Sequence, residues 1–243
     1  MADRYTYIPL TGLFIVLAWG SDDLLQGRRY RKEILAVLAA MAVAVSGAAT
    51  WRQVGYWRDN ITLYRRTLEV TDGNYTIRNN YANALAERGD LDAAIREYRE
   101  VLRIWPHLTR VHNNLGYVLA ARGNIAEAMV HHNEVLRLTA GASVSDGNPG
   151  GRFERATAYF HLGNMYLAQG KAQEAIGEYN ATLALRPDFD KAHNNLGIAN
   201  STIGKYPDAI AAFTRAIQLN PRNLEARKNL EICRKKAEAS GKR

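Results

Sequence analysis

The sequence predicts an all-α protein in which two N-terminal transmembrane helices precede an α-solenoid of four helical repeats. Glycine recurs at one phase, because Gly89 and Gly123, and again Gly170 and Gly204, lie 34 residues apart. An alanine follows five residues after each of these glycines. Two uncharged runs of membrane-spanning length come before the repeats. A fixed period of this length is typical of stacked-repeat proteins.

The composition narrows the class of protein. With 47% hydrophobic and 23% charged residues, the chain is not disordered by composition. Its net charge of +8 permits an anionic partner, but the basic residues are scattered along the repeats, so no nucleic-acid partner is expected. The one cysteine, Cys233, excludes an internal disulfide and leaves the redox compartment open.

Residues 1–52 form the predicted membrane segment. Residues 5–21 contain no charge and are just long enough to cross a bilayer. Residues 34–51 form a second uncharged run, followed by Arg52, and its last residue is Trp51, an aromatic of the kind that anchors at headgroups. The alternative for this second run is an alanine-rich soluble helix. Because basic residues flank the two runs almost equally, the positive-inside rule leaves the orientation open.

Small residues recur at every fourth position of the second run, along one helical face. Such a stripe lets helix backbones approach closely inside lipid. The two runs are therefore interpreted as the last spans of a larger bundle, or as half of a dimer. The stripe consists of Ala36, Ala40, Ala44 and Ala48, with Gly47 beside it.

Residues 53–74 connect the membrane segment to the repeats. Asp59 is placed to cap a helix over residues 60–71. Within this helix, Tyr64 has the repeat phase of three later aromatic residues, Tyr98, Tyr179 and Phe213. The segment is therefore predicted to be a half-repeat, a second helix without its first, which covers the apolar face at the start of the array.

Four repeats follow, and each is expected to fold as helix, glycine turn, helix. Between the second and the third lie residues 143–155, a turn-rich segment expected to be a loop. This loop either bulges from a continuous superhelix or divides the array into two pairs. Residues 224–243 are expected to form a capping helix and a tail. The repeats are residues 75–108, 109–142, 156–189 and 190–223, so that the pairs cover 75–142 and 156–223.

Small residues recur at one position of the first helices. They are expected to leave room for the second helix of the same repeat, so that a large residue there costs a few kcal/mol by overpacking. The four residues are Ala82, Gly116, Gly163 and Gly197.

These residues match the tetratricopeptide repeat (TPR). The third repeat carries the motif best, in the runs AYFHLGNMY and AQGKAQEAIGEY and the following RP. The chain resembles this family over residues 75–223, with the tryptophan of the fourth repeat position replaced in all copies. The resemblance implies an α-solenoid that binds proteins or peptides. The replacing residues are Arg78, His112, Tyr159 and His193.

A second resemblance covers the junction between membrane and repeats. The runs ADRYTYIP and YWRDNITLYRR, with two spans between them, are similar to the junction in transmembrane and TPR-containing proteins of the protein O-mannosyltransferase type. That resemblance implies the C-terminal part of a multi-pass glycosyltransferase whose catalytic acidic motif lies upstream; Asp3 is not that motif. It also implies an integral membrane protein of a bacterial-type inner membrane, with the repeats outside the cytoplasm.

No constellation for catalysis, cofactor binding or metal binding is found in the sequence. The glycines suit helix turns rather than a phosphate loop. No histidine pair has metal-ligand spacing with acidic or cysteine support, and the six histidines are interpreted as repeat-surface residues. No enzymatic activity, cofactor or metal is therefore expected of this chain by itself.

The candidate binding site is a ladder of asparagines on the first helices, which line the groove of a stacked-repeat array. An amide offers both a donor and an acceptor, so it can pair with an extended peptide backbone without reading its sequence. The alternative is that asparagine here belongs to the general repeat consensus and only helps the helices to fold. The ladder comprises Asn79, Asn80, Asn83, Asn113, Asn114, His161, Asn164, Asn194 and Asn195.

Three hypotheses of function follow. The first is a membrane-anchored TPR module that binds a protein or peptide in its groove and contacts lipid and other transmembrane helices. The second is glycosyl transfer, which would require an upstream membrane bundle. The third is an independent scaffold for an envelope complex.

Overall fold

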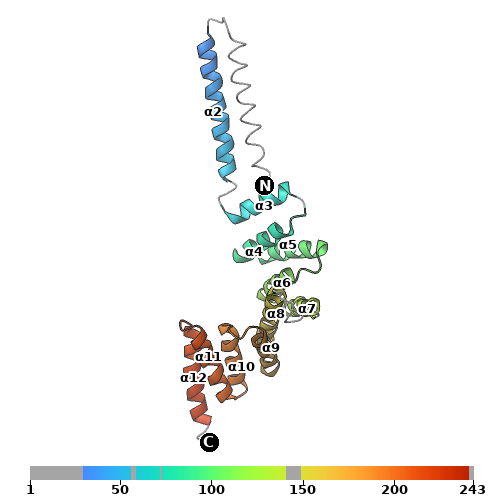
Figure 1. Ribbon diagram of the computed structural model, residues 1–243, viewed down its shortest axis with the longest axis vertical. Helices are drawn as coiled ribbons and strands as arrows, with labels where there is room; N and C mark the ends of the chain where they lie inside the picture. Colours follow the sequence, from blue (N-terminus) through green and yellow to red (C-terminus); the bar gives the residue numbers. More distant parts are fainter. Residues whose placement is uncertain (1–29, 56–58, 72, 141–148, 241–243) are drawn as a thin grey trace. The chain divides into compact units, whose positions relative to one another are not determined.

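The structure is a computed structural model, which describes residues 30–55, 59–71, 73–140 and 149–240 (Figure 1). The chain divides into two compact units, residues 1–63 and 64–243. All regular structure in the described residues is helical, which confirms the all-α fold. The first predicted span, residues 5–21, lies outside the described residues.

The first unit contains one long apolar helix, α2 (Arg31–Gly55). Its stretch Lys32–Arg52 is long and apolar enough to cross a membrane, and within the described residues it is the one helix that meets this test. Its length of 21 residues matches the thickness of a hydrocarbon core. Helix α3 (Asn60–Val70) begins in this unit, and the Asp59 carboxylate accepts from Thr62 N at 2.8 Å, as expected of a cap.

The second unit is a series of antiparallel helices. After the end of α3 come α4 (Tyr75–Glu87), α5 (Leu91–Ile104), α6 (Thr109–Ala121), α7 (Ile125–Leu138), α8 (Pro149–Ala168), α9 (Ala172–Leu185), α10 (Asp190–Thr202), α11 (Tyr206–Leu219) and α12 (Leu224–Ser240). Glycines with φ between 75° and 96° join the helices of each repeat, in the left-handed region that favours glycine. They are Gly89, Gly123, Gly170 and Gly204.

Contacts between the helices show which of them form the inner face. Each helix from α4 onward packs against the next in the chain, and in addition α4 contacts α6, α6 contacts α8, α8 contacts α10, and α10 contacts α12. Among the described residues, α5, α7, α9 and α11 make no such contact with one another. The first helices therefore lie side by side and form the inner face of the array.

In the second, third and fourth repeats, an aromatic ring from the second helix packs against a glycine of the first. A Cβ atom on Gly163 would lie 2.7 Å from the ring of Tyr179, and one on Gly197 would lie 2.6 Å from the ring of Phe213. Both distances are too short for real atoms, which confirms the predicted reason for the small residues. In the second repeat, the ring that faces Gly116 is a histidine, His132.

The array is continuous across the segment between the second and third repeats, since α8 packs against both α6 and α7. The predicted loop over residues 143–155 is too long, because α8 begins at Pro149. A proline suits the first turn of a helix, where its missing N–H costs no hydrogen bond. The added turns are held by Glu154, which is buried, and by Arg152, which donates to the carbonyl oxygen of Leu185 at 2.6 Å.

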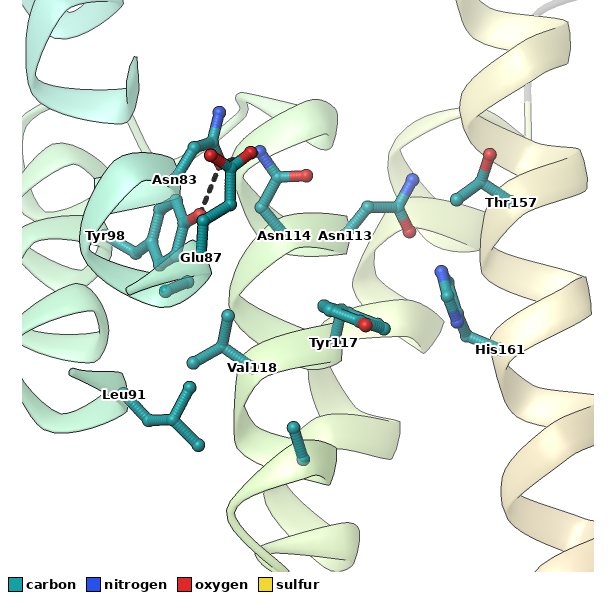
Figure 2. A pocket seen from close by; sticks show the side chains of 12 residues that line it. Asn83, Glu87, Leu91, Tyr98, Asn113, Asn114, Tyr117, Val118, Thr157 and His161 are labelled. Carbon is teal, nitrogen blue, oxygen red and sulfur yellow. Dashed lines mark hydrogen bonds between the residues drawn. The ribbon is translucent and has the colours of Figure 1, made fainter. Parts of the chain in front are cut away.

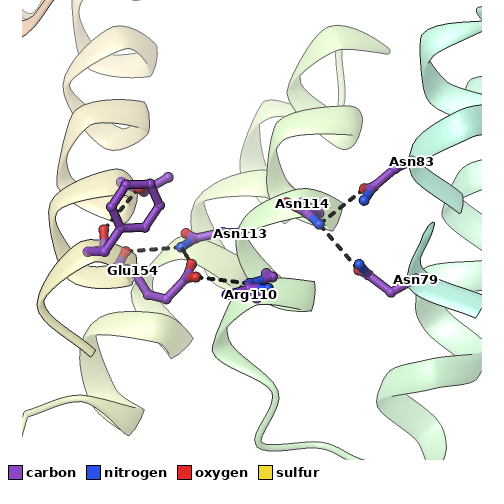
Figure 3. A network of polar contacts seen from close by, with 8 residues as sticks. Asn79, Asn83, Arg110, Asn113, Asn114 and Glu154 are labelled. Carbon is purple, nitrogen blue, oxygen red and sulfur yellow. Dashed lines mark hydrogen bonds and ion pairs between the residues drawn. The ribbon is translucent and has the colours of Figure 1, made fainter. Parts of the chain in front are cut away.

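Glu154 is expected to stabilise the junction between the second and third repeats. Its carboxylate accepts from Asn113 Nδ2 at 2.8 Å and pairs with Arg110 at 3.3 Å (Figure 3). Replacing Glu154 with alanine should lower the free energy of unfolding by about 1–3 kcal/mol, because a buried donor loses its partner. The matched variant Arg110→Ala removes the exposed partner and should cost less than about 1 kcal/mol. Urea unfolding followed by circular dichroism measures both, and equal losses would contradict this role.

Candidate functional site

Polar side chains on the inner face meet where successive first helices touch. At three of these junctions, α4/α6, α6/α8 and α8/α10, three side chains come together: one from a second helix, one from the first helix of the same repeat, and one from the first helix of the next repeat. We call such a set an inner node. Node A is Tyr98, Asn83 and Asn114; node B is His132, Tyr117 and His161; node C is Tyr179, Asn164 and Asn195.

Nodes A and C have the same hydrogen bonds. In node A, the Tyr98 hydroxyl and Asn114 Nδ2 both donate to Asn83 Oδ1, at 2.5 and 3.1 Å (Figure 3 shows the amide pair). In node C, the Tyr179 hydroxyl and Asn195 Nδ2 both donate to Asn164 Oδ1, each at 2.8 Å. Because the oxygens of Asn83 and Asn164 are occupied, these residues offer their NH₂ groups to a ligand.

Three other members of the predicted ladder form hydrogen bonds to neighbouring helices. The buried Asn113 carboxamide donates to the carboxylate and the main-chain oxygen of Glu154, and the buried Asn194 donates to Glu225 at 3.4 Å. The buried Asn79 accepts from Asn114 Nδ2 at 3.2 Å. These bonds join consecutive first helices, which fits the structural role that the sequence left open.

Of the two remaining ladder residues, His161 belongs to node B, and Asn80 lies away from the inner nodes. It lines a separate pocket of about 530 Å³ with Tyr75, His107 and Arg110. The structure therefore brings asparagines of the predicted ladder together in nodes A and C, and it places the histidine of the ladder, His161, in node B.

In node B, aromatic rings occupy the positions that asparagine amides have in nodes A and C. The rings of His132 and His161 are stacked with centroids 5.1 Å apart, and the Tyr117 ring lies 5.4 Å from that of His161. Tyr117 is 58% exposed, whereas the side chain of His132 is fully buried. The predicted surface position is therefore wrong for His132. Its phase, which it shares with Tyr98 and Tyr179, is the signal that could have placed it in the core.

The histidines of node B are neutral at pH 7. Burial, followed by the nearby histidines, lowers the pKa of His132 to about 3, and burial lowers the pKa of His161 to about 4. His132 Nδ1 lies 3.1 Å from Asn113 Oδ1, which can only accept, so the single proton of the His132 ring is on Nδ1. Its Nε2 has no hydrogen-bond partner and faces Gly116.

Histidines also replace the consensus tryptophan at the start of two repeats. His112 Nε2 donates to the carbonyl oxygen of Pro106 at 2.9 Å, and His193 Nε2 donates to that of Pro187 at 3.0 Å. His112 Nδ1 then accepts from His131 Nδ1 at 2.9 Å. These contacts tie each repeat to the turn before it. In the described part of the chain, no three histidine, cysteine or acidic side chains are arranged to hold a metal ion.

A pocket of about 420 Å³ opens between α4, α6 and α8, next to nodes A and B (Figure 2). Asn83, Asn114, Tyr117 and His161 line it, together with Glu87. Amides, an exposed ring and a carboxylate therefore surround one cavity on the inner face.

Comparisons with known proteins agree with the repeat period. Models of the tetratricopeptide repeat match residues 73–140 and 190–223, and a further TPR model matches residues 163–204. Among solved structures, MamA from Desulfovibrio magneticus RS-1 has a TM-score of 0.57 at 20% identity and covers 70% of this chain and 90% of its own. YrrB has a TM-score of 0.54 at 16% identity, with 72% and 84% covered. At these identities the likeness shows the fold alone.

Curated relatives extend the match to nearly the full chain. The protein O-mannosyl-transferase TMTC3 of Mus musculus is 23% identical over 239 residues, which are 96% of this chain and 25% of TMTC3. TMTC4 of Homo sapiens is 31% identical over 98 residues, which are 40% of this chain and 13% of TMTC4. The chain thus spans about a quarter of the length of TMTC3. It is a tetratricopeptide repeat protein that resembles the protein O-mannosyl-transferases TMTC3 and TMTC4.

Proposed function

We propose that the chain is a membrane-anchored TPR module whose inner face binds an extended segment of a protein. The repetition of nodes A and C carries this proposal. In both nodes, internal bonds hold an asparagine in place and leave its NH₂ group without a partner among the described residues. Two such donors on one face suit the carbonyl groups of an extended backbone, and the ordered side chains reduce the entropy lost on binding.

The anchor of this module is the apolar helix α2, with the array held outside the cytoplasm. The length and composition of α2 support a membrane span. The match to TMTC3 over 96% of this chain includes the segment before the repeats, which supports a shared order of N-terminal segment and repeats. Residues 60–71 would then act as the half-repeat that covers the start of the array. Within the second unit, Arg65 Nε donates to the Tyr81 hydroxyl at 3.4 Å, which joins α3 to α4.

The module is further proposed to be the C-terminal part of a glycosyltransferase-like membrane protein. The relatives that it resembles are named protein O-mannosyl-transferases, and the chain matches about a quarter of TMTC3. Glycosyl transfer would then belong to an upstream membrane bundle. Coding DNA upstream of Met1 distinguishes the alternatives: an in-frame region with several spans supports the enzyme, whereas a stop codon there supports an independent envelope scaffold.

Changing Asn83 and Asn164 together to aspartate tests whether their NH₂ groups bind a peptide. Aspartate keeps the oxygen that accepts from the tyrosine hydroxyl, but it replaces the NH₂ donor with an acceptor that repels peptide carbonyls. Binding should fall about tenfold or more, because two hydrogen bonds of about 1 kcal/mol each are lost. The measurement is interferometry of the full chain, in lipid nanodiscs, on immobilised nine-residue peptides of random sequence.

The control for this variant is Asn133→Asp, which makes the same change on the exposed side of α7. It should bind the peptides as the unchanged chain does. Circular dichroism of the double variant should show unchanged helicity, since the node oxygens remain. If the correctly folded double variant binds peptides with undiminished affinity, the proposed role of the inner nodes is wrong.

A further inference from the structure

The pocket between nodes A and B has a mixed lining. Leu91 and Val118 form an apolar part, and Thr157 and Asn114 add polar atoms (Figure 2). Its volume of about 420 Å³ is large enough for one long side chain of a bound peptide. Tyr117 takes the place that Asn83 and Asn164 have in nodes A and C, so an exposed ring interrupts the series of amides at this point.

Hydrogen-bond donors of the pocket are mostly occupied. Asn114 Nδ2 donates to Asn79 and Asn83, and Asn113 Nδ2 donates twice to Glu154. The Thr157 hydroxyl donates to the carbonyl oxygen of Phe153.

The acceptors of the same pocket remain available. Among the described residues, no donor pairs with Asn114 Oδ1, and the Thr157 oxygen has lone pairs to spare. The Glu87 carboxylate adds two more acceptor oxygens. Apart from the NH₂ group of Asn83, the Tyr117 hydroxyl and the single N–H of the neutral His161 ring, the pocket therefore presents acceptors, which suit a ligand with several donors.

Glu87 also gives the pocket a negative charge. It lies in the last turn of α4, and Figure 2 shows its carboxylate beside Tyr98 and Asn83. It forms no ion pair with the described residues, whereas Asp92 on the neighbouring α5 is paired with Arg122 at 2.8 Å. Its charge adds to burial, the larger cause, in raising the pKa of the Tyr98 hydroxyl.

We propose that this pocket accepts an arginine side chain from the peptide that the groove binds. An arginine has five donors and no acceptor, which complements the free acceptors of Asn114, Thr157 and Glu87. Its planar guanidinium stacks on aromatic rings better than the ammonium of lysine, and the Tyr117 ring is 58% exposed. The proposal rests on the proposed function, because it concerns the same groove.

The other charges near the pocket are compatible with a cation. Arg88 follows Glu87 in the sequence but does not line the pocket. His161 lines it, and burial keeps the pKa of His161 at about 4, so its ring carries no charge at pH 7. Because the net charge of the chain is +8, unspecific attraction would favour acidic peptides over basic ones. A preference for arginine would therefore not come from the net charge.

A position-scanning peptide library tests the pocket. Pools of immobilised nine-residue peptides share one fixed central residue, arginine, lysine, alanine or glutamate, and are random elsewhere. The full chain in nanodiscs should be retained on the arginine pool about fivefold more than on the alanine pool, from one exposed charge pair and one stacking contact. Glu87→Gln should reduce this preference to about twofold or less, because only the stacking contact with Tyr117 remains. The matched control Glu174→Gln removes an exposed carboxylate from the second helix α9 and should keep the preference.

The outcomes separate this proposal from the proposed function. Equal retention on all pools, or a preference for arginine that Glu87→Gln leaves undiminished, overturns the arginine pocket and leaves groove binding intact. A preference for glutamate likewise overturns it in favour of unspecific attraction. If the chain is retained on no pool, both the arginine pocket and the proposed function are wrong.

Discussion

Replacing Gly163 with leucine is expected to destabilise the repeat array by about 3 kcal/mol, at the upper end of the usual cost of overpacking. A Cβ atom at this position would already lie 2.7 Å from the ring of Tyr179, which is fully buried. The branched side chain of leucine needs still more room. Either α8 and α9 must separate, or Tyr179 must leave the core.

The second consequence of Gly163→Leu is the loss of node C. The Tyr179 hydroxyl donates to Asn164 Oδ1 at 2.8 Å, and this bond depends on the position of the ring. Because each repeat contacts only its neighbours, a damaged third repeat also separates the first two repeats from the fourth. Urea unfolding should therefore show a lower midpoint and a broader or two-step transition in place of one cooperative step.

Gly177 provides a matched control for this prediction. It lies within α9, and no atom is within 4 Å of a Cβ built on it. Gly177→Leu makes the same chemical change in open space, where it should stabilise the helix by about 0.5–1 kcal/mol, because glycine is a poor helix former. The two variants should therefore shift the unfolding midpoint in opposite directions. Similar midpoints for both would show that the contact between Gly163 and Tyr179 does not limit packing.

The repeat period was enough to predict these small residues, because it depends on positions that recur in every copy. What it could not predict are the features that differ between copies. The start of α8 at Pro149 depends on the burial of Glu154 against α6, a contact between residues far apart in the sequence. Local turn residues therefore gave the wrong boundary, since tertiary contacts override local preference.

The asparagine ladder shows a second limit of the sequence. Neighbouring residues on a helix point about 100° apart, so a change of one position moves a carboxamide from the groove to the next helix. Asn113 and Asn114 are adjacent, yet the first is bonded to Glu154 and the second to Asn79 and Asn83. The phase predicted the inner face, but the separation of groove residues from packing residues needed the coordinates of the neighbouring helices.

Acidification is expected to destabilise the array through node B. The pKa of His132 is about 3 and that of His161 about 4 in the folded chain, against 6.5 as the ordinary value. A depressed pKa means that the unfolded state binds more protons. The contribution of these two histidines to the free energy of unfolding is therefore fully present above pH 6.5. It falls as the pH drops below 6.5, and the fall levels off only below the folded pKa values. The loss between pH 8 and pH 5 should be roughly 2 kcal/mol for each of the two histidines.

The variant His132→Phe isolates the contribution of His132. Phenylalanine is the residue that the fourth repeat has at this phase, where Phe213 packs against Gly197. It cannot take up a proton, so the loss of stability between pH 8 and pH 5 should shrink by roughly 2 kcal/mol. His161→Asn, which places the amide of Asn114 and Asn195 at this position, should reduce the remaining loss. The measurement is urea unfolding at a series of pH values, and the prediction is tested by the slope of the free energy of unfolding against pH.

The slope against pH, and not the free energy of unfolding at one pH, tests the prediction, because His132→Phe also changes stability at every pH. It removes the partner of Asn113 Oδ1, which lies 3.1 Å from His132 Nδ1, and it removes the buried Nε2 that has no partner. These effects are independent of pH and cancel in the difference between pH 8 and pH 5. His107→Gln, at an exposed position between α5 and α6, should keep the slope of the unchanged chain. A slope that His132→Phe leaves unchanged would mean that the buried rings of node B do not cause the acid sensitivity.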